Sequence, residues 1–163
     1  MSETKKALLE EVLADVTNKL KLAGSARAIY ELVVDSLSSL PHFNWTGIYL
    51  VETNHRASHL ALEYYKGKPT DHVRIPKGRG VCGSAWLEEE NIIVEDVRAI
   101  ENYLACSLET RSEIVVLLRK DGQIIGQIDV DSDQVAAFDS EDESALQQIA
   151  TLVDGRLKGL DAT

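Results

Sequence analysis

Apolar residues recur at helical spacing in the first part of the chain. The period of three to four residues runs through residues 3–23 and resumes after Ser25, and it predicts two α-helices. Gly24 fits the end of the first helix, Ser25 could cap the second, and Pro41 ends it. The sequence therefore predicts a helical hairpin over residues 1–40. Its expected inward positions are Leu8, Leu9, Val12, Leu13, Val16, Leu20, Ala28, Ile29, Leu32, Val33, Ser36 and Leu37.

After Pro41 the pattern changes to aromatic and β-branched residues that alternate with polar ones, which is typical of strands. The glycines around Cys82 indicate a tight or closely approached backbone. A short helix should follow them, with Ala85 and Trp86 pointing inward. Residues 96–108 show no period and are expected to form a loop. The other elements expected here are strands at 45–51, 59–65 and 91–95, an extended piece at 73–76 and the helix at 81–88.

A strong hairpin signal lies in the last third of the chain. Asp121-Gly122 separates two apolar runs, residues 113–119 and 123–131, and this dipeptide favours a two-residue turn between strands. Hairpins join neighbouring strands in opposite directions, so we expect a central antiparallel sheet. The terminal helices would cover one face, and the long loops would close a ligand pocket over the other. This is an α+β fold.

The last predicted helix begins at Phe138-Asp-Ser140. Ser140 and Glu143 have the spacing of a capping box, in which each side chain accepts a hydrogen bond from the other residue's backbone. The helix is expected to bury Leu146, Ile149, Ala150 and Val153.

Composition narrows the class of protein. The chain of 163 residues is close to one domain's worth, so residues 1–163 are expected to form a single domain that includes the N-terminal hairpin. A net charge of −10 argues against nucleic acid or an anionic membrane as partner. No apolar run approaches the ~20 residues of a membrane span, and the first residues do not resemble a signal peptide. A cytoplasmic location is expected.

The residues most suited to catalysis or ligand binding lie between Gly78 and Asp131. This stretch holds both cysteines, Cys82 and Cys106, and three acids at the edges of apolar strands: Glu113, Asp129 and Asp131. Acids are costly to bury without partners, and two cysteines in a cytosolic chain are more often reduced, catalytic, metal-binding or simply buried than a structural disulfide. The stretch indicates a site for thiol chemistry on a small polar molecule.

Each of these features also has a structural interpretation. Cys106 or Cys82 could be a buried apolar side chain, and the three acids could form a solvated strand face. Asp129 and Asp131 are two residues apart on a strand and share a face. Trp45 and Tyr49 also share a face, either as one wall of a pocket or as part of the core.

Two further groups of residues near the glycines remain open to interpretation. His72 could carry a proton, and with Cys82 and Cys106 it could bind zinc, although no Cys-x-x-Cys spacing supports that. Arg74, Lys77 and Arg79 form a small basic cluster that could meet a substrate carboxylate or balance nearby acids.

Several motifs together resemble one family. They are Asn44-Trp45-Thr-Gly47-Ile-Tyr49, Val73-Arg-Ile-Pro-Lys-Gly78-Arg-Gly-Val-Cys82-Gly83, Glu95-Asp-Val97, Ala105-Cys106, Ser112-Glu-Ile-Val115, Ile128-Asp-Val-Asp-Ser132 and Phe138-Asp-Ser-Glu-Asp-Glu143. They resemble the GAF domain, and more closely the free methionine-(R)-sulfoxide reductases, which consist of a single GAF domain. The resemblance covers roughly residues 40–155.

This resemblance implies an activity and roles for the candidate residues. Free L-methionine-(R)-sulfoxide would be reduced to methionine, with Cys106 as the nucleophile that becomes a sulfenic acid and Cys82 as the resolving thiol that forms a disulfide with it. A thioredoxin-like reductant would restore both thiols, and no metal or organic cofactor is implied. Trp45 and Tyr49 would form an aromatic wall. The acids around the substrate would be Glu113, Asp129 and Asp131.

Two positions depart from the family pattern. His72 stands where the family usually has a third cysteine, and Ser107 stands where an acid usually follows the catalytic cysteine. Only Cys82 is then left to resolve Cys106. The alternative function is a GAF module that binds a small molecule without turnover. With either function, the N-terminal helices could also pair two copies into a homodimer.

Overall fold

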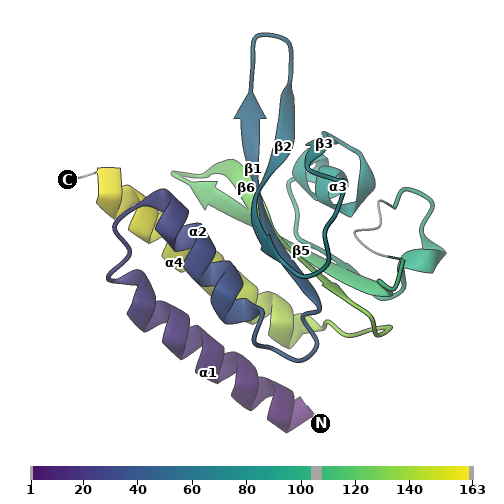
Figure 1. Ribbon diagram of the computed structural model, residues 1–163, viewed down its shortest axis with the longest axis horizontal. Helices are drawn as coiled ribbons and strands as arrows, with labels where there is room; N and C mark the ends of the chain where they lie inside the picture. The colour runs from purple at the N-terminus through teal and green to yellow at the C-terminus, as the bar shows by residue number, and fades with distance from the viewer. Residues whose placement is uncertain (1, 104–107, 162–163) are drawn as a thin grey trace.

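The computed structural model describes residues 2–103 and 108–161, and its centre is one six-stranded sheet (Figure 1). Its strands run in the order β3-β2-β1-β6-β5-β4, and all neighbours are antiparallel. The expected antiparallel sheet is therefore confirmed. The strands are β1 Trp45–Thr53, β2 Ser58–Lys66, β3 Arg74–Pro76, β4 Ile92–Val94, β5 Ser112–Lys120 and β6 Gln123–Ser132.

The turn between β5 and β6 follows from its sequence. Asp121 and Gly122 both have positive φ, 53° and 81°, the backbone of the tight hairpin turn that matches the twist of its strands. The side-chain alternation along β6 then sends Ile128 and Val130 to one face and Asp129 and Asp131 to the other.

Three helices cover one face of the sheet, as expected. Helices α2 (Ala26–Leu37) and α4 (Ser140–Asp161) pack on the strands, and α1 (Ser2–Leu20) lies outside them (Figure 1). The predicted stripes are buried at Leu9, Val16, Leu20, Ile29, Val33, Leu37, Leu146, Ile149, Ala150 and Val153, and half-buried at Leu8, Val12, Leu13, Ala28, Leu32 and Ser36. Within the described ranges, no helix has the length and hydropathy needed to cross a membrane.

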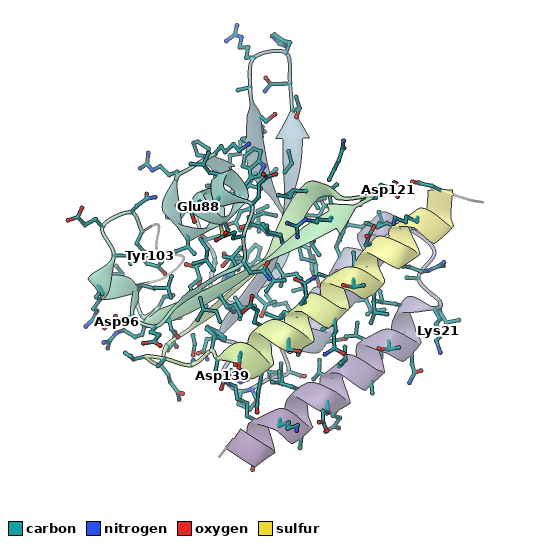
Figure 2. The ribbon with its side chains drawn as sticks, turned by 180° about the vertical axis from the view of Figure 1, so that it is seen from behind. Lys21, Glu88, Asp96, Tyr103, Asp121 and Asp139 are labelled. Atoms are coloured by element: carbon teal, nitrogen blue, oxygen red, sulfur yellow. The ribbon has the colours of Figure 1, made fainter. Side chains whose placement is uncertain are left out.

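The opposite face carries the short helix α3 (Gly80–Glu88) and the loops. Figure 2 shows the labelled Glu88 and Tyr103 on this side of the sheet, away from Asp139 and Lys21. A second apolar cluster forms here, and Ala85 and Trp86 are buried in it as predicted. The sheet thus separates a helix-covered core from a smaller core that contains the candidate residues.

Three sequence expectations need correction. The first predicted helix ends at Leu20 rather than at residue 23, and the expected loop after residue 95 contains one 3₁₀ turn, η1 Val97–Ala99. The predicted capping box of Ser140 and Glu143 is shifted by one residue. Asp139 Oδ1 accepts from the backbone N–H of Glu141, and Asp142 Oδ2 accepts from the backbone N–H of Asp139. The capping residue is therefore Asp139, which directly precedes the predicted cap Ser140.

Candidate functional site

Three carboxyl groups lie together on the second face of the sheet. Glu113 on β5 is the direct cross-strand partner of Asp131 on β6, and Asp129 lies two residues away on the same strand. Their exposed fractions are 3%, 1% and 1%. A solvated strand face is therefore excluded for these acids, and the predicted gathering of the three is confirmed.

Burial and mutual repulsion change the protonation of this group. Burial, followed by the charges of Asp129 and Asp131, raises the pKa of Glu113 well above its usual value. Burial also raises the pKa of Asp129, while the nearby Glu113 and Cys82 act as hydrogen-bond donors that oppose this rise. The surroundings of Glu113 and Asp129 thus favour the protonated form of both carboxyl groups.

The glycines position Cys82 beside these acids. Gly78 and Gly80 have φ values of 87° and 65°, which L side chains rarely adopt. At Gly83 an added Cβ would lie 2.6 Å from the carbonyl oxygen of Pro76, so only glycine lets the two segments approach this closely. Gly83 O also accepts a hydrogen bond of 2.9 Å from Gly78 N. The predicted tight backbone is confirmed, and it fixes the start of α3.

Cys82 faces the carboxyl groups from the first turn of α3. Its thiol is buried and donates to Glu113 Oε2 at 3.9 Å, and Gln127 Nε2 donates to its backbone carbonyl at 3.0 Å. Donor atoms of Cys82, Glu113 and Asp129 all lie within 4.8 Å of one another. Among the described residues, His72 is not part of this cluster. The alternative zinc set of His72, Cys82 and Cys106 includes a residue outside the described ranges.

Trp45 and Tyr49 share a face of β1, as predicted, and the structure shows that the acids lie on the same face of the sheet. Their ring centroids are 6.4 Å apart, and Trp45 also stacks on Tyr65 at 5.6 Å. Gly47 between them makes room for the indole, because an added Cβ would lie 2.4 Å from the Trp45 ring. Trp45 opposes Asp131 across β1 and β6. The two aromatic side chains are therefore both part of the second core and neighbours of the acids.

A small cavity lies between the sheet and the start of α3. Its volume is about 10 Å³, room for about one water molecule. Trp45 and Asp131 are not among the residues that line it. The described residues that line it are Tyr49, His72, Ile75, Arg79, Gly80, Val81, Cys82, Glu113 and Asp129.

His72 and Arg79 acquire a clearer position than the sequence gave them. His72 is half-buried at the cavity, and its backbone carbonyl accepts a 2.7 Å hydrogen bond from the Tyr49 hydroxyl. Arg79 is exposed at the cavity, and within the described residues it makes no ion pair. Of the other two basic residues, Lys77 lies over the ring of Trp86 at 4.9 Å, away from the cavity lining.

Asn102 is a functional candidate that the sequence did not reveal. Its side-chain oxygen accepts from Gly80 N at 3.0 Å, and its side-chain nitrogen donates to Gly78 O at 3.0 Å and to Ser84 Oγ at 3.2 Å. Asn102 therefore holds the segment before Cys106 against the glycine turn. An isolated asparagine in a stretch without period carries no signal of such a contact.

Cys106 lies outside the described residues. Tyr103, three residues before it, is half-buried and packs against the cluster that contains Cys82. Tyr103 thus lies beside the candidate site.

Comparison with known proteins adds independent findings. The family model of the GAF domain matches residues 23–154. GAF domain-containing protein A of Dictyostelium discoideum is 40% identical over 151 residues, covering 93% of each chain. The free methionine-R-sulfoxide reductase of Escherichia coli is 36% identical over 140 residues, covering 86% of this chain and 78% of its own.

A solved structure agrees closely with the fold. The free methionine-R-sulfoxide reductase from Neisseria meningitidis, in complex with its substrate, has a TM-score of 0.89 to this chain at 35% identity. The match covers 97% of this chain and 93% of the other. Both the expected fold and the expected family resemblance are confirmed by these similarities.

Proposed function

Because this chain belongs to the GAF domain family, and within it to the group that includes the free methionine-R-sulfoxide reductases, we propose that it reduces free L-methionine-(R)-sulfoxide to L-methionine. The observation that carries this proposal is the buried carboxyl group of Glu113, which lies 3.9 Å from the thiol of Cys82 and whose pKa is raised by burial. Sulfoxide reduction needs both an acid for the departing oxygen and a thiol that can be oxidised.

The first step assigns Cys106 as the nucleophile. Its thiolate attacks the sulfoxide sulfur, Glu113 gives a proton to the sulfoxide oxygen, and the oxygen passes to Cys106. The sulfoxide sulfur gains two electrons and becomes the thioether of methionine, and Cys106 loses two and becomes a sulfenic acid. Support comes from the position of Tyr103, which brings the preceding segment to the second core.

The second step assigns Cys82 as the resolving thiol. Cys82 attacks the sulfenic sulfur, a disulfide between residues 82 and 106 forms, and the oxygen leaves as water. A thioredoxin-like dithiol then supplies two electrons and two protons by exchange and restores both thiols. This cycle uses no metal and no organic cofactor.

The remaining polar residues are proposed to hold the amino acid. Asp129 and Asp131 would bind its ammonium group by charge-assisted hydrogen bonds, and Arg79, which has no ion-pair partner among the described residues, would meet its carboxylate. Tyr49, with Trp45 behind it, would face the methyl end, where contacts of sulfur with aromatic rings are favourable. The cavity holds about one water molecule, so the lining must move apart before an amino acid enters.

The whole chain, residues 1–163, is proposed to act as one GAF domain in the cytoplasm. Helix α1 lies outside the matched range of 23–154, but it packs against α4 through Leu9 and Val16 of the main core. These contacts support the proposal that α1 belongs to the same domain.

One assay tests the proposed reaction. The protein is incubated with each epimer of free methionine sulfoxide and dithiothreitol, and methionine is quantified by chromatography. We expect consumption of the R epimer alone and no consumption by Cys106→Ser. If neither epimer is consumed while calorimetry detects binding of an amino acid or nucleotide, the chain is instead a GAF module that binds without turnover.

A further inference from the structure

The cluster of Cys82, Glu113 and Asp129 has a property that sulfoxide reduction does not require. It brings one thiol and two carboxyl groups, all buried, within 4.8 Å of one another. We propose that these three side chains bind a zinc ion, and that the bound ion blocks the candidate active site. The family resemblance implies a reaction that needs no metal. The proposed zinc site would therefore inhibit the reaction and take no part in it.

The spacing of the donor atoms suits a tetrahedral ion. With zinc–sulfur and zinc–oxygen bonds of about 2.3 and 2.0–2.2 Å, neighbouring ligand atoms lie about 3.3–3.6 Å apart. Cys82 Sγ and Glu113 Oε2 are already 3.9 Å apart. Small rotations of the side chains would bring all three atoms into the required range, and their backbones are fixed by β5, β6 and the first turn of α3.

The state of Asp129 is a second, independent observation. Its side chain is 1% exposed, one of its oxygens lies in the cluster, and neither oxygen accepts a hydrogen bond from a described residue outside the cluster. Among the described residues, no lysine or arginine pairs with Asp129 or Glu113 either. Buried charges are normally paired or coordinate a metal. A divalent cation is the partner that the surroundings of Asp129 lack.

The donor set selects the kind of ion. Magnesium and calcium prefer oxygen ligands alone, so a thiolate disfavours both. Zinc binds thiolate and carboxylate oxygen together, and three protein ligands leave its fourth position for water. The cavity beside these residues has about the volume of one water molecule.

The expected consequence rests on the proposed function. A zinc ion would hold the Cys82 thiolate and the carboxylate of Glu113, so that neither could resolve a sulfenic acid or give a proton. Reduction should therefore stop when zinc is added and resume when a chelator removes it.

Cobalt(II) provides a test of the site that does not depend on activity. The reduced full-length protein is titrated with cobalt(II), which replaces zinc and shows a near-ultraviolet charge-transfer band when a thiolate binds it. The Cys82→Ser variant should lose this band. Cys106→Ser, which keeps Cys82, should retain it. Zinc should displace the cobalt at one ion per chain.

Variants of the carboxylates complete the test. Asp129→Asn, nearly isosteric with the native residue, should weaken zinc binding at least tenfold in a chelator competition. Asp133→Asn, an exposed change nearby, should leave it unchanged. Circular dichroism checks that each variant is folded. The proposal is overturned if the wild type shows no band, or if Cys82→Ser retains it. Absence of reductase activity alone would count only against the proposed reaction, because no sulfoxide is present in this titration.

Discussion

Glu113 is a carboxyl group in a place where the charged form is costly. It is 3% exposed and faces two aspartates, and burial followed by these charges raises its pKa. A raised pKa favours the protonated form, which is the form that can donate to a sulfoxide oxygen. The burial of Glu113 beside two aspartates both destabilises its charged form in the folded state and favours its proposed use as a proton donor.

The first prediction concerns the pH dependence of this residue. A group whose pKa is raised in the folded state stabilises the fold below its ordinary pKa, and this contribution is lost as the pH rises through the raised value. Glu113→Gln removes the titration, so urea unfolding at pH 8 should show a variant more stable than the wild type by on the order of 1 kcal/mol or more. Its turnover number should fall about 100-fold.

Two results would contradict this prediction. One is a wild type whose stability does not decline relative to Glu113→Gln between pH 5 and pH 8. The other is a Glu113→Gln variant with full turnover, which would leave another acid as the donor. Glu95→Gln, at an exposed position outside the cluster, is the matched control and should change neither quantity.

The second prediction separates the two cysteines. Cys106→Ser should abolish reduction, because a serine hydroxyl is a poor nucleophile without activation. Cys82→Ser should release about one methionine per chain with thioredoxin as reductant and then stop, since no third thiol is present in the chain. Single-turnover chromatography measures this burst. Repeated turnover by Cys82→Ser would show that Cys82 does not resolve Cys106.

At the residue scale, the sequence could predict that the acids lie close together. It could not predict how their surroundings change the pKa of each one. Strand alternation was enough to place Asp129 and Asp131 on one face, and the pairing of Glu113 with Asp131 followed once the hairpin register was set. The protonation of Glu113 depends on burial by α3 and the loops. The three hydrogen bonds of Asn102 depend on a backbone path that no local pattern encodes.

At the scale of elements, the start of α4 depends on one buried carboxylate. Asp142 is fully buried, and its Oδ1 lies 2.6 Å from His42 Nε2, while Lys5 of α1 pairs with its other oxygen. Burial raises the pKa of Asp142, but the hydrogen bonds from His42 and Lys5 outweigh burial and hold that pKa below its ordinary value. This ion cluster fastens α1 to the first turn of α4.

The third prediction follows from this cluster. Asp142→Asn should lower the free energy of unfolding by about 3 kcal/mol at pH 7, because it removes the buried carboxylate that pairs with Lys5 and accepts a hydrogen bond from His42. A lowered pKa stabilises the fold above the ordinary aspartate value, and this contribution is lost as the pH falls through the lowered value. The difference between variant and wild type in urea unfolding should therefore shrink in acid. A constant difference at all pH values would contradict it, and Asp133→Asn is the exposed control.

The fourth prediction concerns the turn before α3. An alanine at Gly83 would place a Cβ 2.6 Å from the Pro76 carbonyl, so the turn and Cys82 with it must shift. We expect Gly83→Ala to cost about 2 kcal/mol of stability and to reduce activity at least tenfold. Gly155→Ala in α4, where an added Cβ meets nothing within 4 Å, should instead raise stability by about 0.5–1 kcal/mol. Thermal unfolding and the methionine assay measure both; equal effects of the two changes would refute the argument.

The elements themselves were largely predictable, and the exceptions have physical reasons. The Asp121-Gly122 hairpin and the Ser25 cap follow from local backbone preferences, and both are present. The misplaced capping box at α4 arose because Asp139 competes with Ser140 for the same role. A strand order in which β1 lies beside β6 could not be obtained from adjacent hairpins, since it depends on packing between distant parts of the chain.

At the scale of the whole molecule, the sheet separates a side covered by helices from a side that contains the candidate site. The helices α1, α2 and α4 fill one side, and the candidate site occupies the other beneath α3 and the loops (Figure 1). The carboxyl groups are buried within this second side, at exposed fractions of 1% to 3%. A ligand that reaches them must be almost completely enclosed.

This enclosure leads to the last prediction, that the protein distinguishes free methionine sulfoxide from blocked forms. N-acetyl-methionine sulfoxide lacks the ammonium group proposed to bind Asp129 and Asp131, and a charge-assisted hydrogen bond contributes about 1.5–3 kcal/mol. The acetyl group would also need space in a cavity of about 10 Å³. We expect kcat/KM for the acetylated R epimer to fall at least 100-fold, measured by competition with the free amino acid. Comparable values for the two substrates would mean that the acids do not bind the amino group, and Asp129→Asn should then leave the preference unchanged.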